Sequence, residues 1–141
     1  MTPLERAKKS TEAMWREDGA SQWLGMELVS VAEGEAVLTI VIQKHHCNGH
    51  GNCHGGISYA LADSAFAFAC NSRNQATVAQ HNIMNYIAPA KEGDRLTATA
   101  QEVSLQGRSG IYDVRVTNQN NQLIATFRGM SRAIKGQLFV E

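Results

Sequence analysis

The sequence has no excess of charge of either sign. Its 141 residues include 13 lysines and arginines and 13 aspartates and glutamates, which cancel. Proteins that bind nucleic acid through its phosphates present a basic stripe or patch. We therefore expect no nucleic acid among the partners of this protein.

The sequence also has no long apolar run, and its number of cysteines is odd. No run approaches the roughly 20 apolar residues that span a bilayer, and the charged N-terminal segment has no apolar signal core. An odd number of cysteines in such a chain predicts free thiols in a reducing compartment: Cys47, Cys53 and Cys70. We expect a cytoplasmic protein with no membrane partner.

The order of predicted elements indicates an α+β fold. With 43% apolar residues and no linker or repeat, residues 1–141 are expected to form one domain, in which residues 1–20 carry a peripheral N-terminal helix. Helical patterns cover residues 3–17 and 56–70, a hairpin covers 24–42, and four strand patterns follow within 76–90, 94–106, 109–119 and 122–134. The four later strands read as a meander. A buried, alanine-rich helix and about six strands predict a curved antiparallel sheet wrapped around a long central helix.

The polar loop before the second helix is rich in histidine and cysteine. It contains His45, His46, Cys47, His50, Cys53 and His54. None of their spacings matches a C-x2-C knuckle or a helical H-E-x-x-H pair, so we expect no metal and no cofactor. Instead of binding a metal, the histidines are expected to face solvent and the cysteines to fill small gaps.

Gly55 and Gly56 stand where the second helix is expected to begin. Backbone N–H groups in the first turn of a helix have no partner inside it, and the helix dipole favours negative charge there. This pattern is typical of an oxyanion hole. A phosphate loop is a poorer match because no Lys-Ser/Thr pair follows, and a simple loop-to-helix hinge stays open as an alternative.

Asp63 is an acid in the middle of an otherwise apolar helix. A buried carboxylate near a substrate can act as a general base or as a nucleophile. The alternative is a structural acid that pairs with Ser64 and faces a cavity or a subunit interface.

The segment HGGISYALADSAFAFACNS, residues 54–72, resembles the hotdog-fold acyl-CoA thioesterases, most closely the phenylacetate-pathway PaaI group. The resemblance extends over roughly residues 20–135 and includes NYIAPAKEGDRLTATAQ and SGIYDVRVTNQNNQLIATFRG. It implies a hotdog fold, an acyl-CoA substrate, and homodimers that pair their sheets edge to edge and commonly form homotetramers.

The same resemblance assigns roles to five matched positions. Gly55 N–H would polarise the thioester carbonyl, and Asp63 would activate water or attack directly. Asn48 would orient the water or substrate, His54 would orient the loop or contact the thioester, and Ser64 would support the carboxylate or water.

Contacts to the CoA phosphates are expected less specifically. Many relatives carry a basic residue before the proline that follows a strand, whereas Ala88 precedes Pro89 here. The residues expected to bind CoA instead are Gly56, Arg95, Arg108, Ser109, Gly110 and Lys135.

Helix geometry adds a prediction about assembly. Gly55 and Asp63 are eight residues apart, or about 12 Å along a helix, so one chain does not easily place both on one carbonyl. A two-fold dimer with antiparallel helices would form two shared sites.

Thioester hydrolysis is the first of three candidate functions, and the resemblance alone favours phenylacetyl-type acyl groups. The alternatives are a hotdog hydroxyacyl dehydratase, whose usual loop histidine and G-x-P are not matched because Ile57 and Ser58 follow HGG, and a non-catalytic acyl-CoA binding module.

Overall fold

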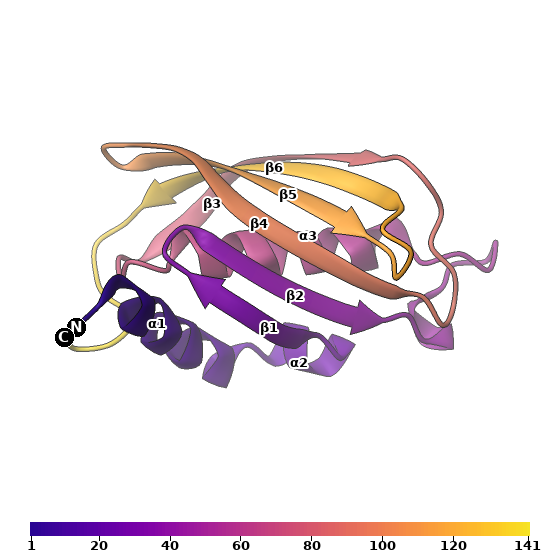
Figure 1. The fold of residues 1–141 in the computed structure, drawn as a ribbon, viewed down its shortest axis with the longest axis horizontal. Coiled ribbons are helices and arrows are strands. Elements are labelled where there is room, and N and C mark those ends of the chain that lie inside the picture. The colour runs from indigo at the N-terminus through magenta and orange to yellow at the C-terminus, as the bar shows by residue number, and fades with distance from the viewer.

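The computed structural model describes residues 1–141, which form three α-helices, one short 3-10 helix and six strands (Figure 1). In chain order these are α1 (Pro3–Glu17), α2 (Gly19–Leu24), β1 (Glu27–Ala32), β2 (Glu35–Val41), η1 (Lys44–His46), α3 (Gly55–Cys70), β3 (Thr77–Tyr86), β4 (Arg95–Gln106), β5 (Ser109–Thr117) and β6 (Leu123–Ala133). The predicted helices, hairpin and later strands are all present. The short α2 and η1 were not predicted.

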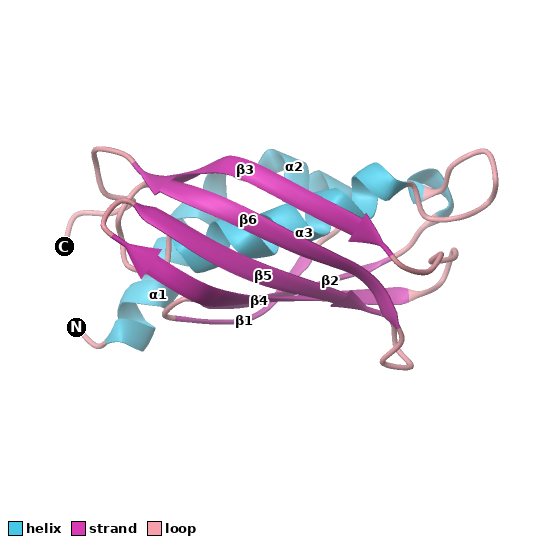
Figure 2. Cartoon of the chain, turned by 90° about the horizontal axis from the view of Figure 1, so that it is seen from above, coloured by secondary structure: helices cyan, strands magenta, loops and turns pink.

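The six strands form one antiparallel sheet in the order β1-β2-β4-β5-β6-β3. The sheet curves around α3, which lies along its inner face (Figures 1 and 2). This arrangement confirms the predicted α+β fold with a central helix wrapped by a sheet. It leaves β1 and β3 as the two edge strands.

The predicted meander is correct for β4, β5 and β6 but wrong for β3. Strand β3 pairs with β6 and not with β4, which lies beside β2. Alternation of apolar residues identifies a strand but says nothing about its neighbours. Here the chain leaves α3 on the β6 side of the sheet, so residues 87–94 must carry it across to β2 before β4 begins.

The N-terminal helices lie beside the sheet and are held by their own caps. Thr2 and Glu5 form a reciprocal capping box at the start of α1, with Pro3 in the first turn. The next helix begins at Asp18, whose carboxylate accepts the N–H of Ser21. None of the helices is both long and apolar enough to cross a membrane.

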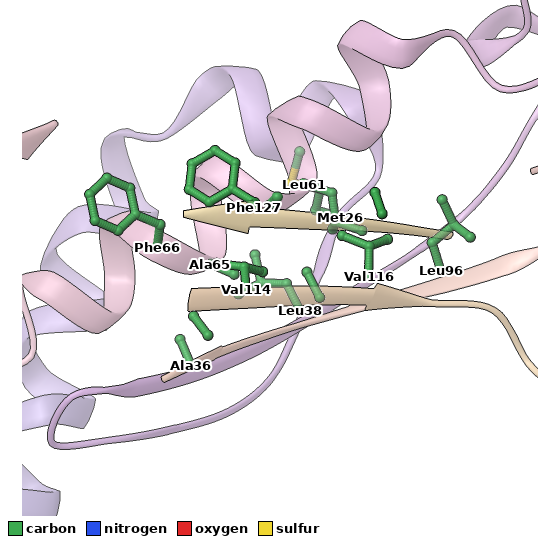
Figure 3. Close-up of a cluster of buried hydrophobic side chains, with 14 of the residues drawn as sticks. Met26, Ala36, Leu38, Leu61, Ala65, Phe66, Leu96, Val114, Val116 and Phe127 are labelled. Atoms are coloured by element: carbon green, nitrogen blue, oxygen red, sulfur yellow. The ribbon is translucent and has the colours of Figure 1, made fainter. Parts of the chain in front are cut away.

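The core lies between α3 and the inner face of the sheet. Figure 3 shows Leu61, Ala65 and Phe66 of α3 among buried side chains of the sheet. Small side chains allow a close approach: a Cβ on Gly129 of β6 would lie 2.7 Å from the Phe66 ring. The middle of α3 is therefore packed closely against β6.

Candidate active site

The histidine-rich loop ends in a cap for α3. His54 is the residue before the helix, and its Nδ1 accepts the backbone N–H of Gly56 over 2.8 Å. The His54 carbonyl accepts the N–H of Ile57 over 2.9 Å. His54 thus occupies the Gly56 N–H, and this predicted CoA contact has no free backbone donor.

Gly55 is placed differently, because its N–H has no acceptor anywhere in the chain. Its carbonyl, in contrast, accepts a hydrogen bond of 2.9 Å from the Tyr86 hydroxyl. The first turn of α3 carries no acidic side chain that would offset the positive end of the helix dipole. The Gly55 N–H is therefore a fixed hydrogen-bond donor that can stabilise negative charge developing on a nearby oxygen.

A pocket of about 430 Å³ opens beside this donor. Its lining includes Gly55, Ser58, Tyr86, Ile87, Pro89 and Ile124. A Cβ on Gly55 would lie 3.2 Å from the Tyr86 ring, so a side chain there would crowd the pocket wall. An added Cβ at Gly55 therefore requires a small shift of the exposed Tyr86 ring and leaves the Gly55 N–H in place.

Asn48 shapes the loop that precedes α3. Its Oδ1 accepts the N–H groups of His50, over 3.0 Å, and Asn52, over 3.2 Å. Such a side-chain turn fixes the local backbone. The Nδ2 of Asn48 makes no hydrogen bond within the chain and is free to donate to another molecule.

Asp63 lies two turns further along α3 and is half-buried. The Asn82 side chain donates its amide N–H to Oδ1 of Asp63 over 3.2 Å. Burial raises the pKa of the Asp63 carboxyl above its ordinary value, and the hydrogen bond from Asn82 partly opposes this. A carboxylate with a raised pKa is a stronger base, as proton abstraction requires.

Ser64 adjoins Asp63 in sequence but bonds elsewhere. Its hydroxyl lies 2.8 Å from that of Ser21, which donates to Oδ2 of Asp18 over 2.7 Å. Because Ser21 gives its one proton to Asp18, Ser64 donates to Ser21. In this arrangement Ser64 ties α3 to α2 and makes no hydrogen bond to the Asp63 carboxylate.

The residues predicted to bind CoA do not gather at one place. Arg108, Ser109 and Gly110 lie at the β4–β5 turn, where the Arg108 carbonyl accepts the N–H of Ala133, and Lys135 follows β6 at the same end. Arg95 starts β4 at the other end, about 35 Å away along the strand. The start of α3, which carries Gly55, lies toward the end of the sheet where β4 begins, so it is remote from the β4–β5 turn of the same chain (Figure 1).

The remaining histidines and cysteines are dispersed. His45 and His50 are exposed, whereas His46 is buried and its Nδ1 accepts the Gln43 N–H. Burial lowers the pKa of His46. All three cysteines are free thiols, and no three histidine, cysteine or acidic side chains lie close enough together to hold a metal ion.

Three residues at the site were not predicted: Tyr59, Asn82 and Tyr86. Asn82 also donates to the Tyr59 hydroxyl over 2.8 Å. Asn82, Met84 and Tyr86 alternate along β3, which is the signal that one face of this strand meets α3. The sequence gives that alternation, but it does not show which face turns inward.

Comparisons with known proteins show the family of this chain. The model of the Thioesterase superfamily matches residues 50–125. The chain is 42% identical over 134 residues to acyl-coenzyme A thioesterase PaaI of Escherichia coli, covering 94% of this chain and 95% of the relative. It is 32% identical over 134 residues to human acyl-coenzyme A thioesterase 13, covering 91% and 95%. The solved structure of E. coli PaaI, from the phenylacetic acid degradation operon, superposes with a TM-score of 0.95 at 39% identity, covering 96% of this chain and 99% of that one. The chain therefore belongs to the thioesterase superfamily and has its hotdog fold.

Proposed function

We propose that this thioester hydrolase acts on acyl-CoA thioesters, with phenylacetyl-type aryl groups as the favoured acyl part. The observation that carries the proposal is the free Gly55 N–H, which meets a pocket at the positive end of α3. The names of the most similar relatives, and the operon of the E. coli protein, support the CoA ester and the aryl group. The apolar part of the pocket lining, which includes Ile87, Pro89 and Ile124, suits such a group.

The chemistry requires a donor and a base. The thioester carbonyl oxygen accepts the Gly55 N–H, which stabilises the negative charge of the tetrahedral intermediate. The Asp63 carboxylate removes a proton from water as the water oxygen bonds to the carbonyl carbon, or attacks that carbon itself. The carbon–sulfur bond then breaks, and the CoA thiolate leaves and takes up a proton.

The site is proposed to be shared between two chains. Gly55 and Asp63 are about 12 Å apart along α3, which is too far for both to reach one carbonyl. On α3 the face with Gly56, Ala60, Asp63 and Ala67 is not fully covered, and most of the edge strand β3 is exposed. A two-fold dimer that reverses α3 would bring Gly55 of one subunit to Asp63 of the other.

The same dimer gives the distant basic residues a use. Reversal of the sheet direction places the Arg108–Gly110 turn and Lys135 of one subunit toward the Gly55 end of its partner. We propose that this turn contributes to holding the CoA phosphates. Lys91, which pairs with Asn52 in an isolated bridge beside the site loop, supplies a nearer positive charge.

The test measures thiol release from a panel of aryl-acyl and aliphatic acyl-CoAs, with and without a chelator. We expect fastest release from phenylacetyl-type thioesters and no effect of the chelator. Binding of acyl-CoA without release from any member of the panel would contradict hydrolysis and favour a binding module. Faster release from long aliphatic thioesters would contradict the aryl preference alone.

A further inference from the structure

The Asn82 amide joins the carboxylate of α3 to a second α3 side chain. Its Nδ2 donates to Oδ1 of Asp63 over 3.2 Å and to the hydroxyl of Tyr59 over 2.8 Å. An amide nitrogen has two hydrogens, so both are used. Asn82 is thereby held at two points, and only one of the two Asp63 oxygens receives a hydrogen bond from within the chain.

A β-bulge aims Asn82 at the helix. The register of β3 against β6 shifts between Ala79 and His81, which leaves one extra residue in β3. Beyond the shift, Asn82, Met84 and Tyr86 are the alternate residues that turn toward α3. Without the extra residue the alternation would reverse, and Asn82 would point away from Asp63.

The amide oxygen of Asn82 shows that this orientation costs free energy. Asn82 Oδ1 is buried and has no hydrogen-bond partner. A buried acceptor without a partner costs free energy that an apolar side chain would avoid. Rotating the amide by half a turn would set its oxygen against the Asp63 carboxylate, where two acceptors repel. The ionised carboxylate therefore selects the observed orientation.

We propose that Asn82 is a positioning residue for hydrolysis, which holds Oδ1 of Asp63 so that Oδ2 faces the reacting water or carbonyl. This inference rests on the proposed function, because it needs Asp63 to be the reacting acid. It assigns to β3 one support for each half of the reaction: Asn82 for the carboxylate and Tyr86 for the Gly55 peptide.

The proposal has an electrostatic consequence. Burial raises the pKa of Asp63, and the Asn82 hydrogen bond is the one contact in the chain that lowers it. The titratable groups near the carboxylate are Tyr59, which shares Asn82, and Cys70, whose own pKa the Asp63 charge helps to raise. No charged side chain of the sheet contributes to the shift at Asp63. Loss of Asn82 must therefore move the titration of Asp63 to higher pH.

The experiment compares pH profiles of kcat/KM for the wild type and three variants. Asn82→Leu removes the donor and keeps the branching of the side chain at Cγ, and Asn82→Asp replaces the donor with an isosteric acceptor that carries a like charge. Asn85→Leu is the matched control, because Asn85 is exposed on the same strand and bonds only to Thr126. We expect the acid limb to move to higher pH in Asn82→Leu and further in Asn82→Asp, with kcat at the plateau about tenfold lower. The Asn85→Leu profile should match the wild type.

An acid limb that stays at the wild-type pH in both Asn82 variants would overturn the proposal, whatever happens to kcat. If Asn82→Leu fails to fold, Asn82→Asp alone decides the question, because its shape is that of the native side chain. Asp63→Asn distinguishes failure of the role proposed for Asp63 from failure of the role proposed for Asn82. Full activity in that variant refutes Asp63 as the reacting acid, and the role of Asn82 with it, while thiol release by the wild type tests the proposed function itself. An inactive Asp63→Asn together with an unmoved acid limb in the Asn82 variants refutes only the role of Asn82.

Discussion

The start of α3 and its middle would contribute to the proposed reaction in opposite ways. At the start, Gly55 presents a backbone N–H that no group in the chain uses, and the helix dipole acts on the same atom. In the middle, Asp63 presents a charged side chain whose surroundings oppose the charge, because burial raises its pKa. In the proposed reaction, Gly55 would act through a hydrogen bond that the chain leaves unmade, and Asp63 would act through lost solvation.

The two regions share one support. Tyr86 donates to the Gly55 carbonyl and Asn82 donates to the Asp63 carboxylate, and both belong to the face of β3 that contacts α3. In a dimer with shared sites, each site would take Gly55 and Tyr86 from one subunit and Asp63 and Asn82 from the other. The β3 strand of each subunit would then support one half of each of the two sites. Substitutions in the two regions should consequently differ in their effects on rate, pH dependence and stability.

The largest effect is expected at Asp63. Asp63→Asn removes the ionisable group with little change in volume, so kcat should fall by on the order of 10² to 10⁴ while binding is largely retained. Steady-state kinetics on the best thioester, with acyl-CoA binding measured separately, give both quantities. Turnover close to that of the wild type would make Asp63 a structural acid.

The same variant should be more stable than the wild type at neutral pH. The pKa of Asp63 is higher in the folded protein than its ordinary value of 3.8, so its protonated form is favoured by folding. Wild-type stability therefore falls as pH rises from that ordinary value through the folded-state pKa. Asparagine does not titrate, and the difference in Tm should shrink as the pH is lowered. A Tm difference that is independent of pH would contradict the burial argument.

Gly55 should respond to loss of its N–H rather than to added volume. Gly55→Pro removes the donor at a first helical position, where proline is tolerated, and the ψ of 133° at His54 suits a residue before proline. Gly55→Ala is the control, because it adds a Cβ against Tyr86 but keeps the N–H. We expect kcat of the proline variant to be about 10² to 10³ below that of the alanine variant. Equal rates would remove Gly55 N–H from the mechanism.

The smallest effect is expected at His54. His54→Ala removes the cap on Gly56, which should cost about 1 kcal/mol of stability and lower the Tm by about 4 °C. The change in kcat should stay within about tenfold, because the Gly55 donor is intact. Thermal unfolding with His50→Ala, an exposed loop histidine, as control measures this. A much larger loss of kcat at unchanged Tm would instead make His54 a reacting group.

The fold could be predicted from local patterns, but its strand order could not. The helical spacing of α1, the apolar α3 and the alternation in each strand are visible in the sequence. The position of β3 beside β6 depends on where the chain leaves α3, which no local pattern reports. The short α2 was missed because six residues are too few for a helical period to appear.

The residues of the candidate site could likewise be predicted from the sequence only in part. Gly55 and Asp63 stand out in the sequence because glycines at a helix start and an acid in an apolar helix need a reason. Asn82 and Tyr86 do not stand out, because the bulge between Ala79 and His81 decides which residues of β3 turn inward. Ser64 was expected to support the carboxylate from its neighbouring position, yet consecutive helical residues point in different directions, and its hydroxyl meets Ser21.

Complementation between two inactive chains tests the shared site most directly. An Asp63→Asn chain is co-expressed with a Gly55→Pro chain, each inactive alone, and mixed dimers are isolated with two different tags. One site of a mixed dimer inherits both substitutions, and the other receives an intact Gly55 and an intact Asp63. With random pairing about half the dimers are mixed, so roughly a quarter of wild-type activity should return in the unfractionated sample. Verified mixed dimers without activity would contradict the shared site and require Gly55 and Asp63 to act within one chain.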